Sequence, residues 1–203
     1  QEKIMRLIEK SLESYRQGKY DEAISGYDEV IKLDSEYGDA YYNKGIVLFD
    51  QNLFEESNKC YDQIIKIDPS HKEVWLNKGV NLFMLKKYEE SIQCYDEVIK
   101  MDSKDDMGWS NKGESLVCLD RYEEAMACYD ESIMINDKSA YVLFMKSKLL
   151  FDLEKYIKYP QENPLPLLRG RAPGTRVPPV ASPSPPDRDA SRRRAPRRCA
   201  DGR

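Results

Sequence analysis

The sequence predicts an all-α solenoid built from stacked helical hairpins, and three observations predict this fold class. First, the segment YEESIQCYDEVI at 88–99 recurs in related form at 20, 54 and 122, so the copies begin 34 residues apart. Second, the apolar residues of each copy fall at helical spacing. Third, glycines recur inside the predicted helices at one position of the repeat. A fixed period of this length indicates units that bury their apolar faces on their neighbours.

Each repeat unit predicts two helices joined by a short turn, which in the third unit span about 72–85 and 89–101. The turn position holds Gly18, Asn52, Lys86 or Asp120. Gly, Asn and Asp tolerate the left-handed backbone that ends many helices. An acidic pair then opens the second helix, where it complements the partial positive charge of a helix N-terminus. The predicted full units are 4–37, 38–71, 72–105 and 106–139.

Aligned positions predict how these helices pack. Glycine inside a helix costs about 1 kcal/mol relative to alanine, so the column that contains Gly79 indicates close helix–helix contact. We expect these glycines to meet the small residues of the Ser91 column, with large aromatic residues between units. A lysine column and an aspartate column also recur. We expect them to pair between helices, with Lys78 near Asp96, or to be solvated charges on an exposed edge.

The fifth unit, at 140–156, stops halfway. Its first helix is expected from Ala140 to about Glu154, but no acidic pair follows Tyr156. Four apolar residues should therefore lack a following helix: Leu149, Leu150, Phe151 and Leu153. This helix is expected to act as a cap, as the end of a truncated array or as a self-association face.

These columns resemble the tetratricopeptide repeat (TPR) family over about residues 4–156. The family's Trp, Gly, Tyr, Ala, Phe and Pro positions correspond in type to Trp75, Gly79, Leu82, Ser91, Tyr95 and Ser103. Pro69 keeps the proline one unit earlier, whereas lysine replaces the family's usual leucine before the glycine. The resemblance implies a right-handed superhelical solenoid whose first helices line a concave groove for an extended peptide or a partner helix.

The resemblance also implies which residues face that groove. They are Tyr42, Asn43, Ile46, Phe49, Leu76, Asn77, Val80, Phe83, Met84, Asn111, Glu114 and Val117. The three asparagines stand one unit apart, and an amide side chain offers both a donor and an acceptor. We therefore expect them to bond the backbone of a bound peptide. The alternative is that asparagine is simply common at this position of the family.

One known binding mode of the family is not expected. The carboxylate clamp for acidic chaperone tails needs Lys and Asn in one unit, Asn in the next, and Lys with Arg in the third. From the first unit these positions hold Ile8, Leu12, Asn43, Glu73 and Asn77. Only the middle Asn is present there, and the same is true from the second unit. We expect no chaperone-tail binding, and a ligand that is apolar or bound through its backbone.

Other functional classes lack their signatures. His71 is the only histidine and stands in a predicted turn, so we expect no catalytic site, no cofactor and no metal site. The five cysteines form no CxxC motif, and reduced thiols favour a cytoplasmic location. No apolar run approaches the roughly 20 residues that span a bilayer, so no membrane partner is expected.

Charge divides the chain into two parts. Residues 1–159 carry 22 basic and 32 acidic residues, a net charge of −10, whereas 160–203 carry ten arginines and four acidic residues, a net charge of +6. The proline- and arginine-rich stretch 160–203 is predicted to be disordered. A basic patch at 192–198 suits a nuclear localisation signal or nucleic acid. We favour a fusion, a frame change or a cloning scar, and the acidic part argues against nucleic-acid binding.

The expected function is therefore that of a non-enzymatic scaffold or adaptor that binds a protein or peptide. The alternative is the targeting arm of a larger enzyme, similar to a glycosyltransferase or phosphatase, whose catalytic domain is absent from this sequence.

Overall fold

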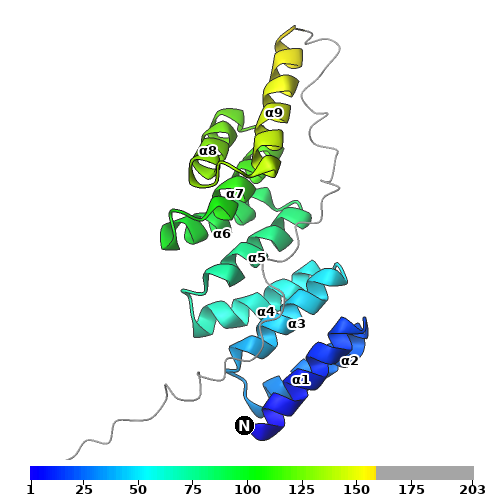
Figure 1. Cartoon of the computed structure of the whole chain (residues 1–203). Coiled ribbons are helices and arrows are strands. Elements are labelled where there is room, and N and C mark those ends of the chain that lie inside the picture. Colours follow the sequence, from blue (N-terminus) through cyan, green and yellow to red (C-terminus); the bar gives the residue numbers. More distant parts are fainter. Residues whose placement is uncertain (159–203) are drawn as a thin grey trace, which may run out of the picture.

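The computed structural model describes residues 1–158, and these residues form nine α-helices without a β-strand (Figure 1). The helices are α1 (Glu2–Arg16), α2 (Tyr20–Leu33), α3 (Gly38–Asp50), α4 (Phe54–Ile67), α5 (Lys72–Met84), α6 (Tyr88–Met101), α7 (Asp106–Cys118), α8 (Tyr122–Ile135) and α9 (Ala140–Lys158). The predicted all-α class is confirmed. The predicted disordered tail at 160–203 lies outside the described residues.

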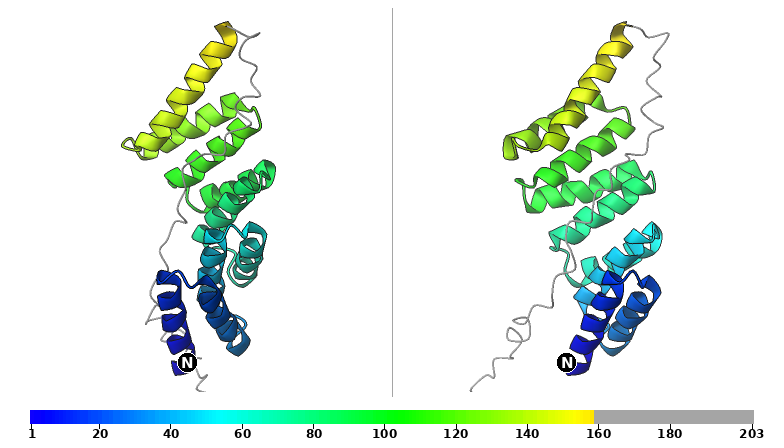
Figure 2. Two further views of the ribbon diagram at one scale, coloured as in Figure 1. Left: turned by 90° about the vertical axis from the view of Figure 1, so that its right-hand side faces the viewer. Right: turned by 45° about the vertical axis from the view of Figure 1, so that its right-hand side comes forward.

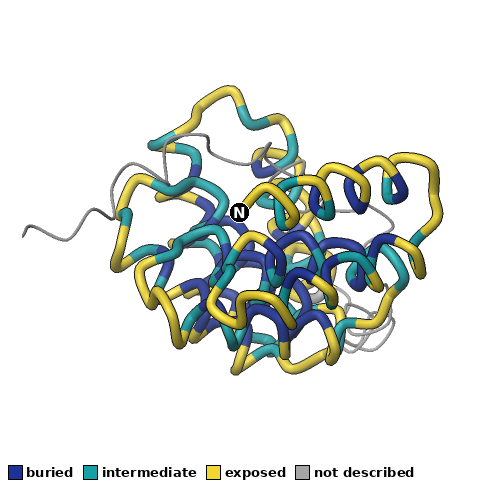
Figure 3. Tube along the Cα trace, turned by 90° about the horizontal axis from the view of Figure 1, so that it is seen from below, coloured by how far each residue is buried: buried dark blue, intermediate teal, exposed yellow. Residues whose placement is uncertain are grey.

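The helices stack as successive hairpins along one axis, with α1 at one end and α9 at the other (Figures 1 and 2). Helices α2, α4, α6 and α8 begin 34 residues apart, in keeping with the repeat period. Buried residues gather where neighbouring helices face one another, and the turns are mostly exposed (Figure 3). The fold is therefore a solenoid, in which each unit contacts mainly its neighbours in the chain.

The turn inside each hairpin has one backbone conformation. Gly18, Asn52, Lys86 and Asp120 have φ values of 74°, 60°, 61° and 60°. The amide that follows each of them donates to a carbonyl five residues earlier, as when the Lys87 N–H donates to the Leu82 oxygen at 2.8 Å. This left-handed residue closes a first helix with a Schellman-type bond. Lys86 adopts the conformation although its side chain does not favour it.

The glycine column makes room for tyrosine rings, and it also meets the small-residue column as predicted where the Ser57 hydroxyl donates to the Gly45 carbonyl oxygen at 2.8 Å. A Cβ atom on Gly79 would lie 2.5 Å from the Tyr95 ring. Equivalent atoms on Gly45 and Gly113 would lie 2.6 and 2.7 Å from the rings of Tyr61 and Tyr129. These rings are fully buried, so the glycines are what allow a large side chain to pack against the first helix.

The lysine and aspartate columns do pair, but each lysine reaches back to the previous unit. Lys78 Nζ lies 2.6 Å from Asp62 Oδ1, so the predicted partner Asp96 is wrong. Asp96 accepts instead from Lys112, also at 2.6 Å. The same link joins Lys44 to Asp28 at 2.5 Å and Lys146 to Asp130. The pairs therefore connect units rather than the two helices of one hairpin.

The two middle interfaces between units are polar at one recurring position. Asn81 Nδ2 donates to Ser57 Oγ and to Asn58 Oδ1, both at 2.8 Å. At the next interface the hydroxyls of Ser91 and Ser115 lie 2.8 Å apart. The outer two interfaces are apolar at the same positions, with Ala23 and Val47 in one core cluster and Ala125 and Leu149 in another. The four interfaces are therefore not interchangeable.

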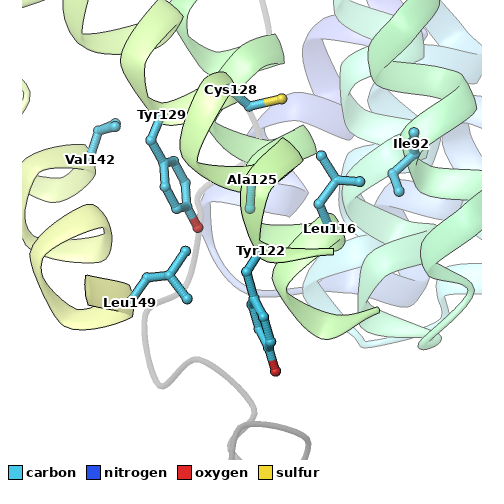
Figure 4. Close-up of a cluster of buried hydrophobic side chains, with 8 residues drawn as sticks. All are labelled: Ile92, Leu116, Tyr122, Ala125, Cys128, Tyr129, Val142 and Leu149. Carbon is cyan, nitrogen blue, oxygen red and sulfur yellow. The ribbon is translucent and has the colours of Figure 1, made fainter. Parts of the chain in front are cut away.

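The last helix is longer and better packed than predicted. It continues to Lys158, four residues beyond the expected end. Leu149 is buried with Val142 beside the Tyr129 ring of α8, so the preceding helix covers a residue for which the sequence predicts no following one (Figure 4). Leu153 is half-buried in the same cluster, whereas Leu150 and Phe151 are exposed as predicted.

Candidate ligand-binding face

The twelve residues predicted to contact a ligand lie on α3, α5 and α7, and we call them the binding face. The structure buries two thirds of them within the chain: Tyr42, Asn43, Ile46, Leu76, Asn77, Val80, Asn111 and Glu114. Phe49, Phe83 and Val117 are half-buried, and Met84 is 42% exposed. The ligand-contacting role of the twelve residues stays a prediction, with Met84 the most accessible of them.

Aromatic pairs support this face beside the hairpin turns. Phe83 meets Tyr88 edge-on with ring centroids 5.4 Å apart, and Phe49 meets Phe54 in the same way at 5.5 Å. Edge-to-face contacts of this kind add about 0.5–1.5 kcal/mol beyond area burial. In each pair one ring belongs to the last turn of a first helix and the other to the start of the second. The pairs therefore fix the orientation of the half-buried rings.

The three asparagines occupy one position in successive units but have different hydrogen bonds. Asn77 Nδ2 donates to the Tyr42 hydroxyl at 3.3 Å. Asn43 Oδ1 and Asn111 Nδ2 are buried and have no hydrogen-bond partner among residues 1–158. One asparagine thus presents an unused acceptor and another an unused donor, and a buried group in this state costs about 1–3 kcal/mol.

A buried carboxylate stands on the binding face of α7. Glu114 accepts a hydrogen bond from the Tyr141 hydroxyl of α9 at 2.7 Å. Burial raises the pKa of Glu114 above its ordinary value of 4.5, and the Tyr141 bond opposes that shift. Tyr141 was missed by sequence reasoning, because nothing in the repeat pattern indicates that the fifth unit reaches back to this carboxylate.

Within residues 1–158, no helix has the length and apolar character needed to cross a bilayer. The same residues contain no group of three or more His, Cys, Asp or Glu side chains placed to hold a metal ion.

Solved structures with similar folds share low sequence identity with this chain. MamA (residues 41 to the end) from Desulfovibrio magneticus is 14% identical, with a TM-score of 0.72, covering 86% of this chain and 99% of that one. PilF from Pseudomonas aeruginosa is 19% identical, with a TM-score of 0.65 and coverages of 84% and 78%. The first TPR domain of Spaghetti (RPAP3), solved with an HSP90 peptide, is 21% identical, with a TM-score of 0.56 and coverages of 60% and 96%.

A comparison with curated proteins found no match. Family models give a more specific result. A TPR repeat model matches residues 12–52, and tetratricopeptide repeat models match 42–106 and 108–139. Together the three models match more than half of the sequence. Repeats of this kind are generally protein-interaction modules. The chain belongs to the tetratricopeptide repeat family.

Proposed function

We propose that this protein is a scaffold or adaptor whose binding face takes an extended peptide or a partner helix. The TPR domain of RPAP3 was solved with a peptide, SRMEEVD, which supports peptide binding as a use of this fold. Met84 and the half-buried ring of Phe83 offer apolar contact on α5.

The observation that carries the proposal is the unpaired state of two buried amides. In the described part of the chain, Asn43 Oδ1 has no donor and Asn111 Nδ2 has no acceptor. A peptide backbone carries both groups at regular intervals, so one ligand can satisfy both asparagines once their side chains turn toward it. Each such bond contributes about 0.5–1.5 kcal/mol. Apolar contacts supply the rest of a micromolar affinity, which corresponds to about −8 kcal/mol.

The ligand chemistry we propose differs from that of SRMEEVD, which carries acidic residues near its C-terminus. The positions that would supply the cations of a clamp for such a tail hold Ile8, Glu73 and Asn77 instead. Glu114 adds a buried carboxylate to the face. We therefore propose a ligand without an acidic terminus at this site.

A cytoplasmic location is part of the same proposal. Cys60, Cys94 and Cys128 are unpaired and buried, and burial raises the pKa of each thiol. Thiols in this state suit a reducing compartment. Fractionation of cells that express a tagged chain tests this point, and recovery in a secretory fraction would contradict it.

The binding test compares partners captured from a cell lysate by the full chain and by a variant with Asn43→Ala, Asn77→Ala and Asn111→Ala. We expect the variant to lose a partner that the parent holds. Asn58→Ala is the matched control, because it removes a buried asparagine of α4 that lies outside the binding face. Circular dichroism must show equal helicity. Identical partners for all three chains would refute the proposed role of the asparagines.

A further inference from the structure

The last helix carries an apolar face that no described part of the chain covers. Val142, Met145 and Leu149 of α9 pack toward α8. The opposite side carries four large apolar residues, Leu143, Phe144, Leu150 and Phe151, which are 43%, 63%, 49% and 54% exposed. We call these four residues, with Ser147 between them, the α9 face. Four large exposed apolar residues on one side of one helix indicate an interaction surface rather than scattered surface residues.

Residues at the equivalent positions of the earlier units are buried against another helix. Phe144 occupies the position of Tyr42, Leu76 and Ser110, all of which are buried. Leu150 occupies the position of Leu48, Leu82 and Leu116, which are buried as well. In those units the second helix of the hairpin lies beside the first. The α9 face thus has the composition of a contact surface, with its contact missing among residues 1–158.

The α9 face is self-complementary about Ser147. Leu143 and Phe144 precede this residue by four and three positions, and Leu150 and Phe151 follow it by three and four. With 3.6 residues per turn, the two leucines form a row on one side of Ser147 and the two phenylalanines a row on the other. A second α9 that runs antiparallel across this face meets leucine with leucine and phenylalanine with phenylalanine.

Size and charge also fit this arrangement. Ser147 is small and exposed at the crossing point, which lets two helix backbones approach closely. Glu154 stands two helical turns beyond Ser147, close to the centre line of the α9 face. In the antiparallel arrangement Glu154 lies opposite Ala140 of the other copy. No like charges are brought together on the centre line. Lys155 lies beside the face with its Nζ 4.4 Å from the Phe151 ring centroid, where it leaves the leucine row free.

The other end of the solenoid does not offer a comparable apolar surface. In each later unit, one side of the first helix packs against the previous unit. The equivalent side of α1 is polar and exposed, and it carries Lys3, Arg6, Lys10, Glu13 and Gln17. Stacking the α9 face on this side of another copy would bury charged groups without partners, which is costly. A symmetric contact between two α9 faces avoids that cost.

We propose that two copies of this chain associate through their α9 faces, antiparallel and two-fold symmetric about Ser147. In such a dimer Leu143 of one copy packs on Leu150 of the other, and Phe144 packs on Phe151. The contact is isologous and therefore closes at two copies. It lies at the end of the stack remote from α1 (Figure 1), and it pairs two binding faces in one particle, which raises avidity for a partner with two sites.

Sedimentation velocity and light scattering on the full chain test this proposal. The expected mass is twice the 23.7 kDa of one chain. Leu143→Glu and Leu150→Lys each place a charge in the apolar contact, and each should weaken dimerisation by roughly tenfold or more. Both substitutions in one chain should restore the dimer, because the carboxylate introduced at position 143 of each copy then lies opposite the ammonium introduced at position 150 of the other. Met134→Lys on α8 is the control, since Met134 is 71% exposed outside this face.

Three results would overturn the proposal. A monomeric parent at about 100 μM would mean that another segment or another protein covers the face, since a stable dimer of this kind is expected well below that concentration. A dimer that both single variants retain would place the contact elsewhere. Failure of the double variant to dimerise, with unchanged helicity, would exclude the antiparallel register.

Discussion

Substituting Gly79 by alanine tests whether the glycine column exists to admit the tyrosine rings. The added Cβ would lie 2.5 Å from a carbon of the Tyr95 ring, closer than any relaxed contact allows. Tyr95 is 1% exposed, so its ring has no free space to move into. Alanine gains about 1 kcal/mol of helix propensity over glycine, whereas overpacking a filled core costs about 1–3 kcal/mol. We therefore expect a net loss of up to about 2 kcal/mol in the free energy of unfolding.

Urea denaturation followed by far-UV circular dichroism measures this change. Gly38→Ala is the matched control, because a Cβ atom at Gly38 meets nothing within 4 Å, and we expect no loss of stability there. A cycle with Tyr95→Leu tests the stated cause. The smaller side chain should relieve the clash and give a coupling energy of about 0.5–3 kcal/mol. Stabilisation by Gly79→Ala, or additivity with Tyr95→Leu, would refute the reasoning.

Three further predictions concern contacts between units. A double-mutant cycle on Lys112→Ala and Asp96→Ala should give a coupling energy of about 0.2–1 kcal/mol that falls as salt is added. The same cycle on Lys78 and Asp96 should give no coupling. Coupling between Lys78 and Asp96 but not between Lys112 and Asp96 would contradict the pairing between units. Asn81→Ala should lower the free energy of unfolding by about 1–3 kcal/mol in denaturant titrations, because the Asn58 acceptor at 2.8 Å loses its donor; an unchanged midpoint would count against the network. Glu114→Gln should change how the stability of the fold depends on pH. Burial raises the pKa of Glu114 in the folded chain, so the folded chain holds this proton more tightly than the unfolded chain does. The parent should therefore lose stability as pH rises from the unfolded-state pKa of Glu114 through its folded-state pKa. Thermal unfolding between pH 4 and 7 should therefore show the parent falling relative to the variant, and parallel profiles would contradict a raised pKa.

The features that follow from local pattern could be read from the sequence. The 34-residue period and the helical spacing of residues such as Ile92 and Tyr95 were enough to predict nine helices and their hairpin order, because both reflect which face of a helix is buried. The left-handed turn was also predictable at Gly18. Lys86 could be assigned to the turn only by alignment with the other units, since lysine alone does not favour that backbone.

Features that depend on which neighbour lies opposite could not be read from columns. The lysine column pairs with aspartates of the previous unit, although the sequence suits pairing within one unit equally well. The Tyr95 ring fills the space beside Gly79 because the packing of α6 against α5 sets the distance between them. For the binding face, burial of eight residues and the different hydrogen bonds of Asn77 and Asn111 appear only when side-chain positions are known.

The most direct test of the proposed function places a photo-crosslinking side chain at Met84, the most exposed residue of the binding face. The same side chain at Met134 serves as the control, because it is exposed on α8 outside that face. A partner captured by the full chain should crosslink to position 84 and not to position 134, and the crosslink should disappear in the triple asparagine variant. Capture at position 134 alone, or capture at position 84 that survives the asparagine substitutions, would contradict peptide binding through this face.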